Sequence, residues 1–354
     1  MSNRLIGFQK KIIALWLCIV LLCMTGCNGT ASNHNDAKPQ AEKKIQIGMT
    51  FDSFVIERWQ RDRDVFVSMA KELGAEVNVQ SANGDIDEQI RQIEYFIESG
   101  MDVIVIVCID SNGLSDAVKK AKAAGVKVIA YDRLIRNADV DLYISFDNSM
   151  VGTLMANALI EAGVPDGGNV LMLGGDEADN NVSQVETAFR EVMDRHNIQI
   201  LDSTHAPGWR AELAADYVNT HKDIVSRADG IMCGNDNIAS QAIHALAEQR
   251  MAGNIYVVGQ DADLEACQRI VEGIQTMTVY KPVERLASQA AQCAVALANG
   301  DSMGDIEILT MNDGTYEVPY VKLDPVSVTA ENMDEVIING GFHLKEDVYL
   351  NAPD

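Results

Sequence analysis

The chain has 354 residues, of which 47% are hydrophobic and 23% are charged, and its formal net charge is −24 at pH 7. This composition is typical of a soluble globular protein with room for two domains of about 150 residues each. The excess of negative charge argues against nucleic acid or an anionic membrane surface as a partner, because phosphate groups repel such a surface.

The start of the chain has the pattern of a secretory signal peptide. Arg4, Lys10 and Lys11 form a basic beginning, and residues 12–24 are an uninterrupted apolar run. That run is too short for a membrane span but has the length of a signal-peptide core. We therefore expect residues 1–26 to be removed on export.

A cysteine follows the apolar run directly. The sequence MTGC at residues 24–27 resembles the lipobox of bacterial lipoproteins, so we expect Cys27 to be lipidated. A plain signal peptide cut near the same place is the alternative. Cleavage before Cys27 would remove three positive charges and shift the net charge to −27. Residues 27–44 are polar and lack apolar periodicity, which predicts a flexible tether.

Besides Cys27, four cysteines remain after such a cleavage: Cys108, Cys233, Cys267 and Cys293. They are widely spaced, and no two form a C-x-x-C pair. An exported domain of this size does not need disulfides, so we expect buried free thiols, with a single bridge as the alternative.

From residue 45 onward, short β-rich runs alternate with segments of helical period. The first series consists of expected strands at residues 45–49, 77–80, 103–107, 126–131 and 142–146, with helices beginning at Asp52 or Ser53, at Asp85, at Leu114 and at Asn148. The second series consists of expected strands at residues 169–173, 199–204, 230–233, 256–258 and 276–279, with helices at residues 238–249 and directly after Pro282.

Two consecutive β/α series predict an α/β protein with two Rossmann-like lobes, each a parallel sheet flanked by helices. The tail, residues 306–354, is too short for another domain. We expect it to supply strands that cross back between the lobes.

Polar and aromatic side chains follow the expected strands. Arg58 and Trp59 follow the first strand, and the others are Arg133, Asp147, Asn148, Asn180, Asn181, Trp209, Asn235, Asp236, Gln260, Asp261 and Lys281. The carboxyl ends of parallel strands share one edge, so these residues are predicted to line a cleft between two facing lobes. Each also has a purely structural explanation: Asn148, Asp236 and Asp261 as helix N-caps, the cations as solvated surface charges, and Trp59 as a half-buried core residue.

This mixture of side chains suits a sugar. Planar Arg, carboxylate and amide groups bind adjacent hydroxyls in pairs, and an aromatic ring packs against the apolar C–H face of a pyranose. Trp59 and Trp209 are the two tryptophans left after export. Unpaired buried hydroxyls would cost about 1–3 kcal/mol each, so such a site selects for the number and orientation of hydroxyls.

Several of these segments belong to longer motifs that are similar to those of the D-xylose-binding proteins of bacterial ABC sugar transporters. The resemblance extends from about residue 45 to about residue 343, and it is weak at residues 183–195 and 206–221. The motifs are ERWQRDRD (57–64), VQSANGD (79–85), AYDRLI (130–135), YISFDN (143–148), DNN (179–181), GW (208–209), ND (235–236), GQDADL (259–264) and QTMTVYKP (275–282).

The resemblance implies the type I periplasmic-binding-protein fold, in which a three-segment hinge joins two lobes that close on the sugar. The implied lobes are residues 45–147 with 282–322 and residues 148–281 with 323–354. The implied ligands of the sugar are Arg58, Arg133, Asn181, Asn235, Asp261 and Lys281, with Trp59 and Trp209 as aromatic walls. Glu57 also matches the motif without a clear role, and Asp147 and Asn148 are expected at the hinge. No catalytic residue, metal or cofactor is implied.

The expected function is that of a lipid-anchored D-xylose receptor on the outer face of the cytoplasmic membrane, which delivers its sugar to an ABC permease. D-xylose could be replaced by a closely related aldose, since only steric exclusion by Trp59 and Trp209 would reject the extra CH₂OH of a hexose. A sensor lipoprotein that partners an extracellular histidine-kinase domain would have the same binding site and remains the alternative.

Two other classes of protein fit less well. Catalysis on a sugar by Asp261 and Lys281 lacks support, because the chain has no H-E-x-x-H or P-loop motif. A sugar-responsive DNA-binding repressor shares the fold, but the export signal and the lack of an N-terminal helix-turn-helix argue against it.

Overall fold

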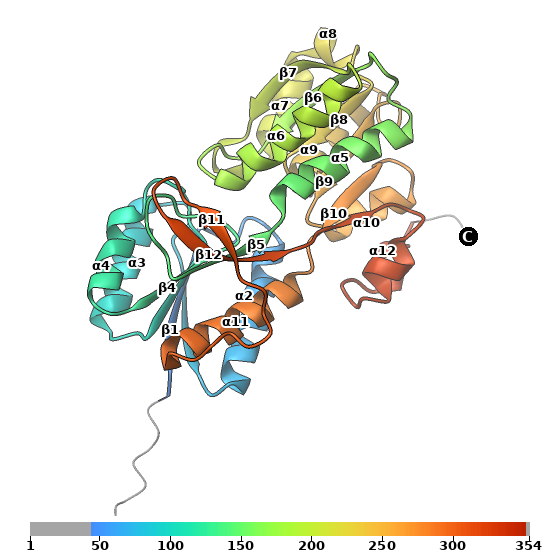
Figure 1. The fold of residues 1–354 in the computed structure, drawn as a ribbon. Coiled ribbons are helices and arrows are strands. Elements are labelled where there is room, and N and C mark those ends of the chain that lie inside the picture. The colour runs from blue at the N-terminus through green and yellow to red at the C-terminus, as the bar shows by residue number, and fades with distance from the viewer. Residues whose placement is uncertain (1–43, 352–354) are drawn as a thin grey trace, which may run out of the picture. The chain divides into compact units, whose positions relative to one another are not determined.

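Two β-sheets form the core of residues 44–351, the part of the chain that the structure, a computed structural model, describes (Figure 1). The first sheet has seven strands in the order β11-β12-β5-β4-β3-β1-β2, and the second has six in the order β13-β10-β9-β8-β6-β7. The order β2-β1-β3-β4-β5 thus recurs as β7-β6-β8-β9-β10. We call each sheet with the helices packed on it a lobe, the first and the second.

The first lobe contains elements from both ends of the described chain: β1 (Gln46–Phe51), α2 (Arg58–Glu72), β2 (Glu76–Ser81), α3 (Ile86–Glu98), β3 (Val103–Ile106), α4 (Ser115–Ala123), β4 (Lys127–Tyr131), β5 (Leu142–Phe146), α11 (Val283–Asn299), β11 (Leu309–Asn312) and β12 (Glu317–Leu323). Helices α2 and α11 pack together on one face of its sheet, and α3 and α4 cover the other face (Figure 1).

The second lobe contains the middle of the chain and its end: α5 (Asn148–Ala162), β6 (Asn169–Gly174), α6 (Asn180–Arg195), β7 (Gln199–His205), η1 (Pro207–Trp209), α7 (Glu212–Thr220), α8 (Lys222–Val225), β8 (Gly230–Cys233), α9 (Asp236–Glu248), β9 (Tyr256–Gln260), α10 (Leu264–Val271), β10 (Met277–Tyr280), β13 (Val326–Val328), η2 (Asp334–Ile338) and α12 (Lys345–Val348). Helices α5 and α6 pack closely, because Gly152 lets the backbones meet; a Cβ there would lie 2.0 Å from the carbonyl oxygen of Val185.

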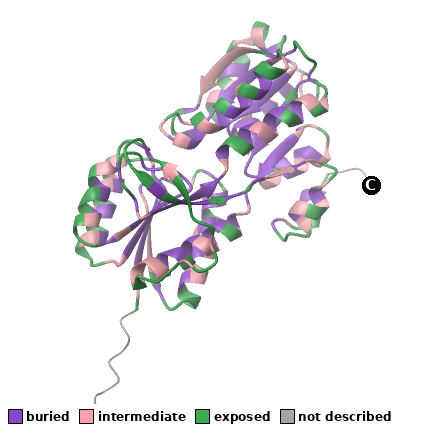
Figure 2. Ribbon diagram, in the orientation of Figure 1, coloured by how far each residue is buried: buried purple, intermediate pink, exposed green. Residues whose placement is uncertain are grey.

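The central strands are apolar because helices cover both of their faces. Strands β3, β5, β8 and β10 are buried at every position, and Figure 2 shows the buried residues running along both sheets. The predicted two-lobe α/β fold is therefore confirmed.

The sheets are mostly parallel, as predicted, and antiparallel pairs occur at their margins. Strand β12 pairs with β5 in parallel, but β11 pairs with β12, and β13 with β10, in antiparallel orientation. Parallel neighbours need a long crossover connection. The short turn from β11 to β12 leaves no room for one. Strand β13 is not paired with β12, and it enters the second sheet two residues after β12 leaves the first.

The chain passes between the sheets three times: from β5 to α5, from β10 to α11, and from β12 to β13. Two of these passages are joined to each other. The backbone N–H of Asp147 donates to the carbonyl oxygen of Leu323 at 2.9 Å, and Lys322 Nζ donates to Asp147 Oδ2 at 2.8 Å. We propose that the lobes comprise residues 45–147 with 282–322 and residues 148–281 with 323–354, with the hinge at these passages.

Several helices begin beside the predicted residue. Helix α2 begins after Glu57, not at Asp52 or Ser53, because the Asp52 carboxylate accepts a hydrogen bond from Arg133 Nη1 at 2.9 Å instead of capping a helix. Helix α5 is capped by Asp147, whose side chain accepts from the Met150 N–H. The N-cap of α9 is Asn235 and not Asp236, because the side chain of Asn235 accepts a hydrogen bond from the N–H of Ile238.

Other predictions concern single residue types. Cys108, Cys233, Cys267 and Cys293 are buried free thiols, as expected. The signal peptide, the lipidation of Cys27 and nearly all of the tether lie outside the described residues. Within residues 44–351, no helix has both the length and the apolar character that a membrane crossing requires.

Candidate functional site

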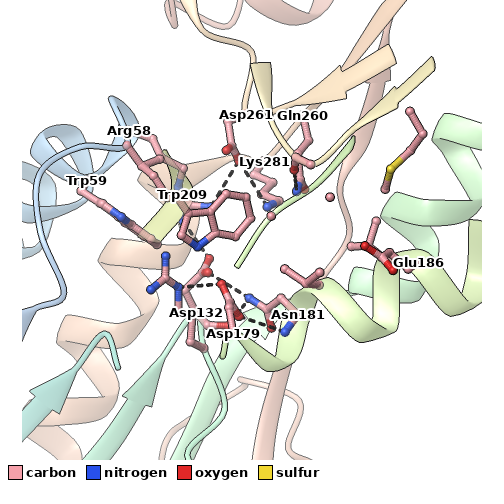
Figure 3. A pocket seen from close by; sticks show the side chains of 18 residues that line it. Arg58, Trp59, Asp132, Asp179, Asn181, Glu186, Trp209, Gln260, Asp261 and Lys281 are labelled. Carbon is pink, nitrogen blue, oxygen red and sulfur yellow. Dashed lines mark hydrogen bonds and ion pairs between the residues drawn. The ribbon is translucent and has the colours of Figure 1, made fainter. Parts of the chain in front are cut away.

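A pocket lies where the carboxyl ends of the strands from both sheets meet, as Figure 3 shows. Its lining includes seven of the eight predicted ligand-binding side chains, namely Arg58, Trp59, Arg133, Asn181, Trp209, Asp261 and Lys281. They come from the loops and helix starts that follow β1, β4, β6, β7, β9 and β10. The expected convergence on one rim is therefore observed, while binding of a sugar by these residues remains a proposal.

Arg58 is held by carboxylates on its own lobe. It is the first residue of α2, and its Nη2 donates to Asp132 Oδ2 at 2.8 Å. One helical turn further on, Asp62 accepts from Arg58 Nε at 3.2 Å and from Nη2 at 3.3 Å. The guanidinium carbon lies 4.5 Å from the centroid of the Trp59 ring. Burial alone would lower the pKa of Arg58, but these carboxylates outweigh it and raise the pKa well above its ordinary value.

Asp132 links the two lobes at the centre of the site. Its backbone is in the left-handed region with φ of 63°, and its carbonyl oxygen accepts from Ser145 Oγ at 2.6 Å and from Asn181 Nδ2 at 3.1 Å. Burial would raise the pKa of this carboxyl, but the positive charges of Arg58, Lys281 and Arg133 lower it overall. Asp132 is therefore a fixed anion among buried cations.

Arg133 lies between the two tryptophans. Its guanidinium carbon is 5.6 Å from the Trp59 ring and 5.9 Å from the Trp209 ring. Its Nη1 donates to Asp52 Oδ2 and to the carbonyl oxygen of Cys108 at 3.0 Å. Across the pocket, its Nε forms an ion pair at 2.8 Å with Asp179 Oδ2 of the second lobe, although the N–H is not aligned for a hydrogen bond.

The start of α6 brings two polar residues to the pocket. Asp179 caps the helix, and its side chain accepts from the N–H of Asn181 at 2.9 Å. Burial raises the pKa of Asp179 to about 6, although the charge of Arg133 opposes this shift. The Asn181 amide donates to Asp132 and accepts from Asn148 Nδ2 at 2.9 Å, so it connects both lobes to the β5–α5 passage.

Asp261 and Lys281 form the opposite wall, as their positions in Figure 3 show. Lys281 Nζ lies 3.2 Å from Asp261 Oδ1, and Arg58 Nη1 lies 3.8 Å from the same oxygen. The backbone of Asp261 has φ of 97° and donates its N–H to the carbonyl oxygen of Val279 at 2.8 Å. The loop after β9 is thus strained in a way that turns this carboxylate toward the pocket.

The indole ring of Trp209 enters the pocket by packing directly against the backbone of Gly175. A Cβ at Gly175 would lie 2.3 Å from the indole ring of Trp209, closer than any packed structure allows. The backbone N–H of Trp209 donates to the carbonyl oxygen of Ala206 at 2.8 Å, which fixes the short helix η1. The glycine after β6 therefore determines where this aromatic wall stands.

Several buried polar atoms of the pocket residues have no hydrogen-bond partner among residues 44–351. They are Trp59 Nε1, Trp209 Nε1, Arg133 Nε and Nη2, Gln260 Oε1 and Asp261 Oδ1. Buried polar groups of folded proteins are almost always hydrogen-bonded. A pocket whose walls carry both unpartnered donors and unpartnered acceptors is built for a ligand that supplies both, as hydroxyl groups do.

Six residues named from the sequence lie away from this lining: Glu57, Asp147, Asn148, Asn180, Asn235 and Asp236. Asn235 is buried but does not line the pocket, and its Oδ1 accepts from Ile238 N at 2.9 Å, so its role toward a ligand stays a prediction. Glu57 is exposed and lies outside the pocket. Asp147 and Asn148 lie at the β5–α5 passage, outside the pocket lining.

Sequence reasoning missed three polar residues that line the pocket, Asp132, Asp179 and Glu186, whereas Gln260 lies in the lining as expected. Asp132 and Asp179 stand inside the motifs AYDRLI and DNN, so their neighbours in the sequence marked the right place. Glu186 lies in the weakly matching segment, and its Oε1 is 2.9 Å from His205 Nε2. Nothing in the sequence marked it.

The site has the composition of a binding site. Its carboxylates face guanidinium or ammonium groups, and within the described chain no cluster of three His, Cys, Asp or Glu residues could hold a metal ion. Fixed ion pairs, unpartnered donors and acceptors, and two indole rings can hold a neutral polyhydroxylated ring without altering it.

Comparison with known proteins identifies the family. The sequence profile of the family described as "Periplasmic binding protein domain" matches residues 47–302. The chain is 42% identical to the D-xylose-binding periplasmic protein of Haemophilus influenzae over 313 residues, which cover 87% of this chain and 93% of that protein. It is also 42% identical to the D-xylose-binding periplasmic protein of Escherichia coli, with 86% and 93% covered.

A solved structure agrees. An ABC transporter solute-binding protein from Clostridium phytofermentans with bound β-D-glucose matches with a TM-score of 0.77 and 27% sequence identity, over 86% of this chain and 99% of that one. Two α/β lobes with a pocket between their strand ends thus define a solute-binding protein of type I. The chain belongs to the periplasmic binding protein family, and within it to the group of the D-xylose-binding periplasmic proteins. Proteins of this family are non-enzymatic, which confirms the prediction that the chain is not an enzyme.

Proposed function

We propose that this protein is an extracytoplasmic receptor for D-xylose or a closely related aldose, and that it serves an ABC transporter. The observation that carries the proposal is the set of buried, unpartnered donors and acceptors contributed to one pocket by both lobes. A pyranose matches such a set, because each of its hydroxyls donates and accepts. Among the pyranoses we choose D-xylose, because both relatives at 42% identity are named D-xylose-binding periplasmic proteins.

Each predicted residue takes a role that fits its chemistry. Arg58, Arg133, Asn181, Asp261 and Lys281 bind hydroxyl and ring oxygens, and Asn235 remains a candidate for the same role. Trp59 and Trp209 form the aromatic walls and exclude the CH₂OH group of a hexose by their bulk. No step of this mechanism breaks or forms a covalent bond.

Binding is coupled to closure of the lobes. Contacts between the lobes, such as Arg133–Asp179 at 2.8 Å and Asn181–Asp132 at 3.1 Å, surround the same pocket that would hold the sugar. A ligand that binds residues of both lobes favours the closed state by the contacts available only there. The closed form would then be the one that a permease recognises.

We further propose that Cys27 carries the lipid anchor that holds the receptor on the outer face of the cytoplasmic membrane. The support is the MTGC sequence at residues 24–27 behind an apolar core. Replacing Cys27 by serine should move the protein from the membrane fraction to the soluble fraction. Equal membrane retention of the variant would contradict the anchor and leave the sugar site untouched.

Calorimetry tests the sugar assignment. The chain from residue 28 onward is titrated with xylose, ribose, arabinose, glucose and galactose, and xylose is expected to bind most tightly. Arg133→Ala and Asp261→Ala should abolish binding while the fold is retained, whereas Arg136→Ala, at an exposed arginine in the same segment, should bind like the wild type. Unimpaired affinity in the first two variants would remove the proposed site.

A further inference from the structure

Gln260 is a buried pocket residue that the sequence places at the cleft but does not name as a ligand of the sugar. It ends β9, its side chain lines the pocket, and only 5% of the residue is exposed. Its Nε2 donates to the carbonyl oxygen of Gly234 at 2.5 Å, while its Oε1 has no hydrogen-bond partner in residues 44–351. A buried amide whose NH₂ group is hydrogen-bonded while its oxygen is not is uncommon, and this indicates that a ligand supplies the missing donor.

The orientation of this amide is fixed by its surroundings. The carbonyl oxygen of Gly234 can only accept, so it must face the NH₂ group of Gln260. A reversed amide would place two acceptors against each other. The backbone of Gln260 is held as well, because it pairs with Val279 in the neighbouring strand. Its oxygen is therefore directed away from Gly234 and cannot exchange places with the NH₂ group.

The other unpartnered groups of the pocket show what this oxygen contributes. Trp59 Nε1, Trp209 Nε1 and Arg133 Nη2 are donors. The acceptors are Gln260 Oε1 and Asp261 Oδ1, and the latter lies within 3.2 Å of the Lys281 ammonium. Gln260 Oε1 is uncharged and has no hydrogen-bond donor beside it among residues 44–351, so an O–H group of the ligand can supply the missing hydrogen bond.

We propose that Gln260 determines specificity by accepting a hydrogen bond from one ring hydroxyl of the sugar. This inference rests on the proposed function, since it concerns the ligand of the same pocket. A hydroxyl at that position completes the pairing of the amide. A hydrogen or a fluorine there leaves the oxygen buried and unpaired, because neither can donate.

The test is a double-mutant cycle in which one change is made in the protein and the other in the sugar. Calorimetry measures the binding of D-xylose and its four monodeoxy analogues to the wild type and to Gln260→Met. In the wild type, each deletion of a hydroxyl should weaken binding, at the position facing Gln260 by roughly ten- to a hundredfold. In Gln260→Met, the penalty at that one position should disappear, while the other three penalties stay unchanged.

A matched control is Gln89→Met. Gln89 is also a buried glutamine, its Nε2 donates to the carbonyl oxygen of Val107 at 2.9 Å, and its oxygen accepts from Ile109 N at 2.9 Å. It lies on α3, outside the pocket, so none of the four penalties should change. Unchanged penalties in Gln260→Met would overturn the role of Gln260.

A second measurement needs no variant. Fluorine can accept weakly but cannot donate, so the four monodeoxyfluoro xyloses should regain affinity over the deoxy sugars only where the pocket supplies an N–H donor. At the position facing Gln260, the fluoro and deoxy analogues should bind equally weakly. Recovery at all four positions would refute the inference. Absence of any xylose binding by the wild type would instead refute the proposed function, and the inference with it.

Discussion

The buried carboxylate of Asp62 offers a sharp test of how Arg58 is held in the site. The residue is fully buried, and its two oxygens accept from Arg58 Nε, Arg58 Nη2 and the Tyr131 hydroxyl. Removing one partner of a buried ion pair costs about 3–5 kcal/mol. Arg58 keeps Asp132 at 2.8 Å, so Asp62→Ala should lower the free energy of unfolding by the smaller value, about 3 kcal/mol.

Urea denaturation followed by circular dichroism measures this change, with comparison of the m-values to check that the unfolding transition is of the same kind. Tyr131→Phe should cost about 1 kcal/mol, and the double variant should lose less than the sum because both residues serve one network. Asp64→Ala is the control on the same helix; its side chain is 67% exposed, so the loss should stay below about 0.5 kcal/mol. A loss below about 1 kcal/mol for Asp62→Ala would refute the reasoning.

Three further outcomes follow from the site. Gly175→Ala should displace the Trp209 ring, since its Cβ would lie 2.3 Å from that ring, and calorimetry should show at least a roughly tenfold weaker Kd for xylose with normal circular dichroism. The pKa of Asp179 is raised by burial to about 6, so the stability contributed by this group is complete below about pH 4 and is lost as the pH rises through 6. Urea denaturation at a series of pH values should therefore show that the free energy of unfolding of Asp179→Asn rises relative to that of the wild type by on the order of 2–3 kcal/mol between pH 4 and pH 7. A difference between the two proteins that does not change with pH would contradict the burial effect. The four described cysteines are buried free thiols, so a thiol reagent should label none of them before denaturation and all of them after it.

The position of the site was predictable from the sequence because it depends on strand direction. Arg133, Asp261 and Lys281 each lie one or two residues after the end of a strand, and the carboxyl ends of parallel strands meet at one edge whatever the details of the helices. Hydrophobic periodicity was enough to locate these strands. It was also enough to predict two lobes, because the β/α rhythm starts again after the fifth strand.

The exact helix starts were not predictable, because good N-cap residues occur there in pairs. Asp147-Asn148 and Asn235-Asp236 each offer two suitable side chains, and local chemistry does not distinguish them. Tertiary contacts determine which residue of each pair caps the helix. Asn148 is needed by Asn181, and the Asp236 carboxylate accepts from Thr278 Oγ1 at 2.6 Å, so in each pair the other residue caps the helix.

The ion pairs of Asp52 and Asp132 were not predictable for a related reason. Each acts through a partner far away in the sequence: Asp52 through Arg133, 81 residues later, and Asp132 through Arg58, 74 residues earlier. Asp132 also has φ of 63°, which no apolar period reveals. Charges that pair over such separations are visible only once the fold has brought their strands together.

The charges of the pocket explain why closure should depend on the sugar. Arg133 and Asp179 come from different lobes, and so do Arg58 and Asp261, so each pair leaves water only when the lobes meet. Desolvation of a buried ion pair can cancel its Coulomb attraction, so these pairs alone give little net drive to close. Closure without sugar would also bury the indole N–H groups and the amide oxygen of Gln260 without partners. The hydroxyls of the ligand remove that cost, and a few kcal/mol of such differential binding is enough to make the closed state dominant.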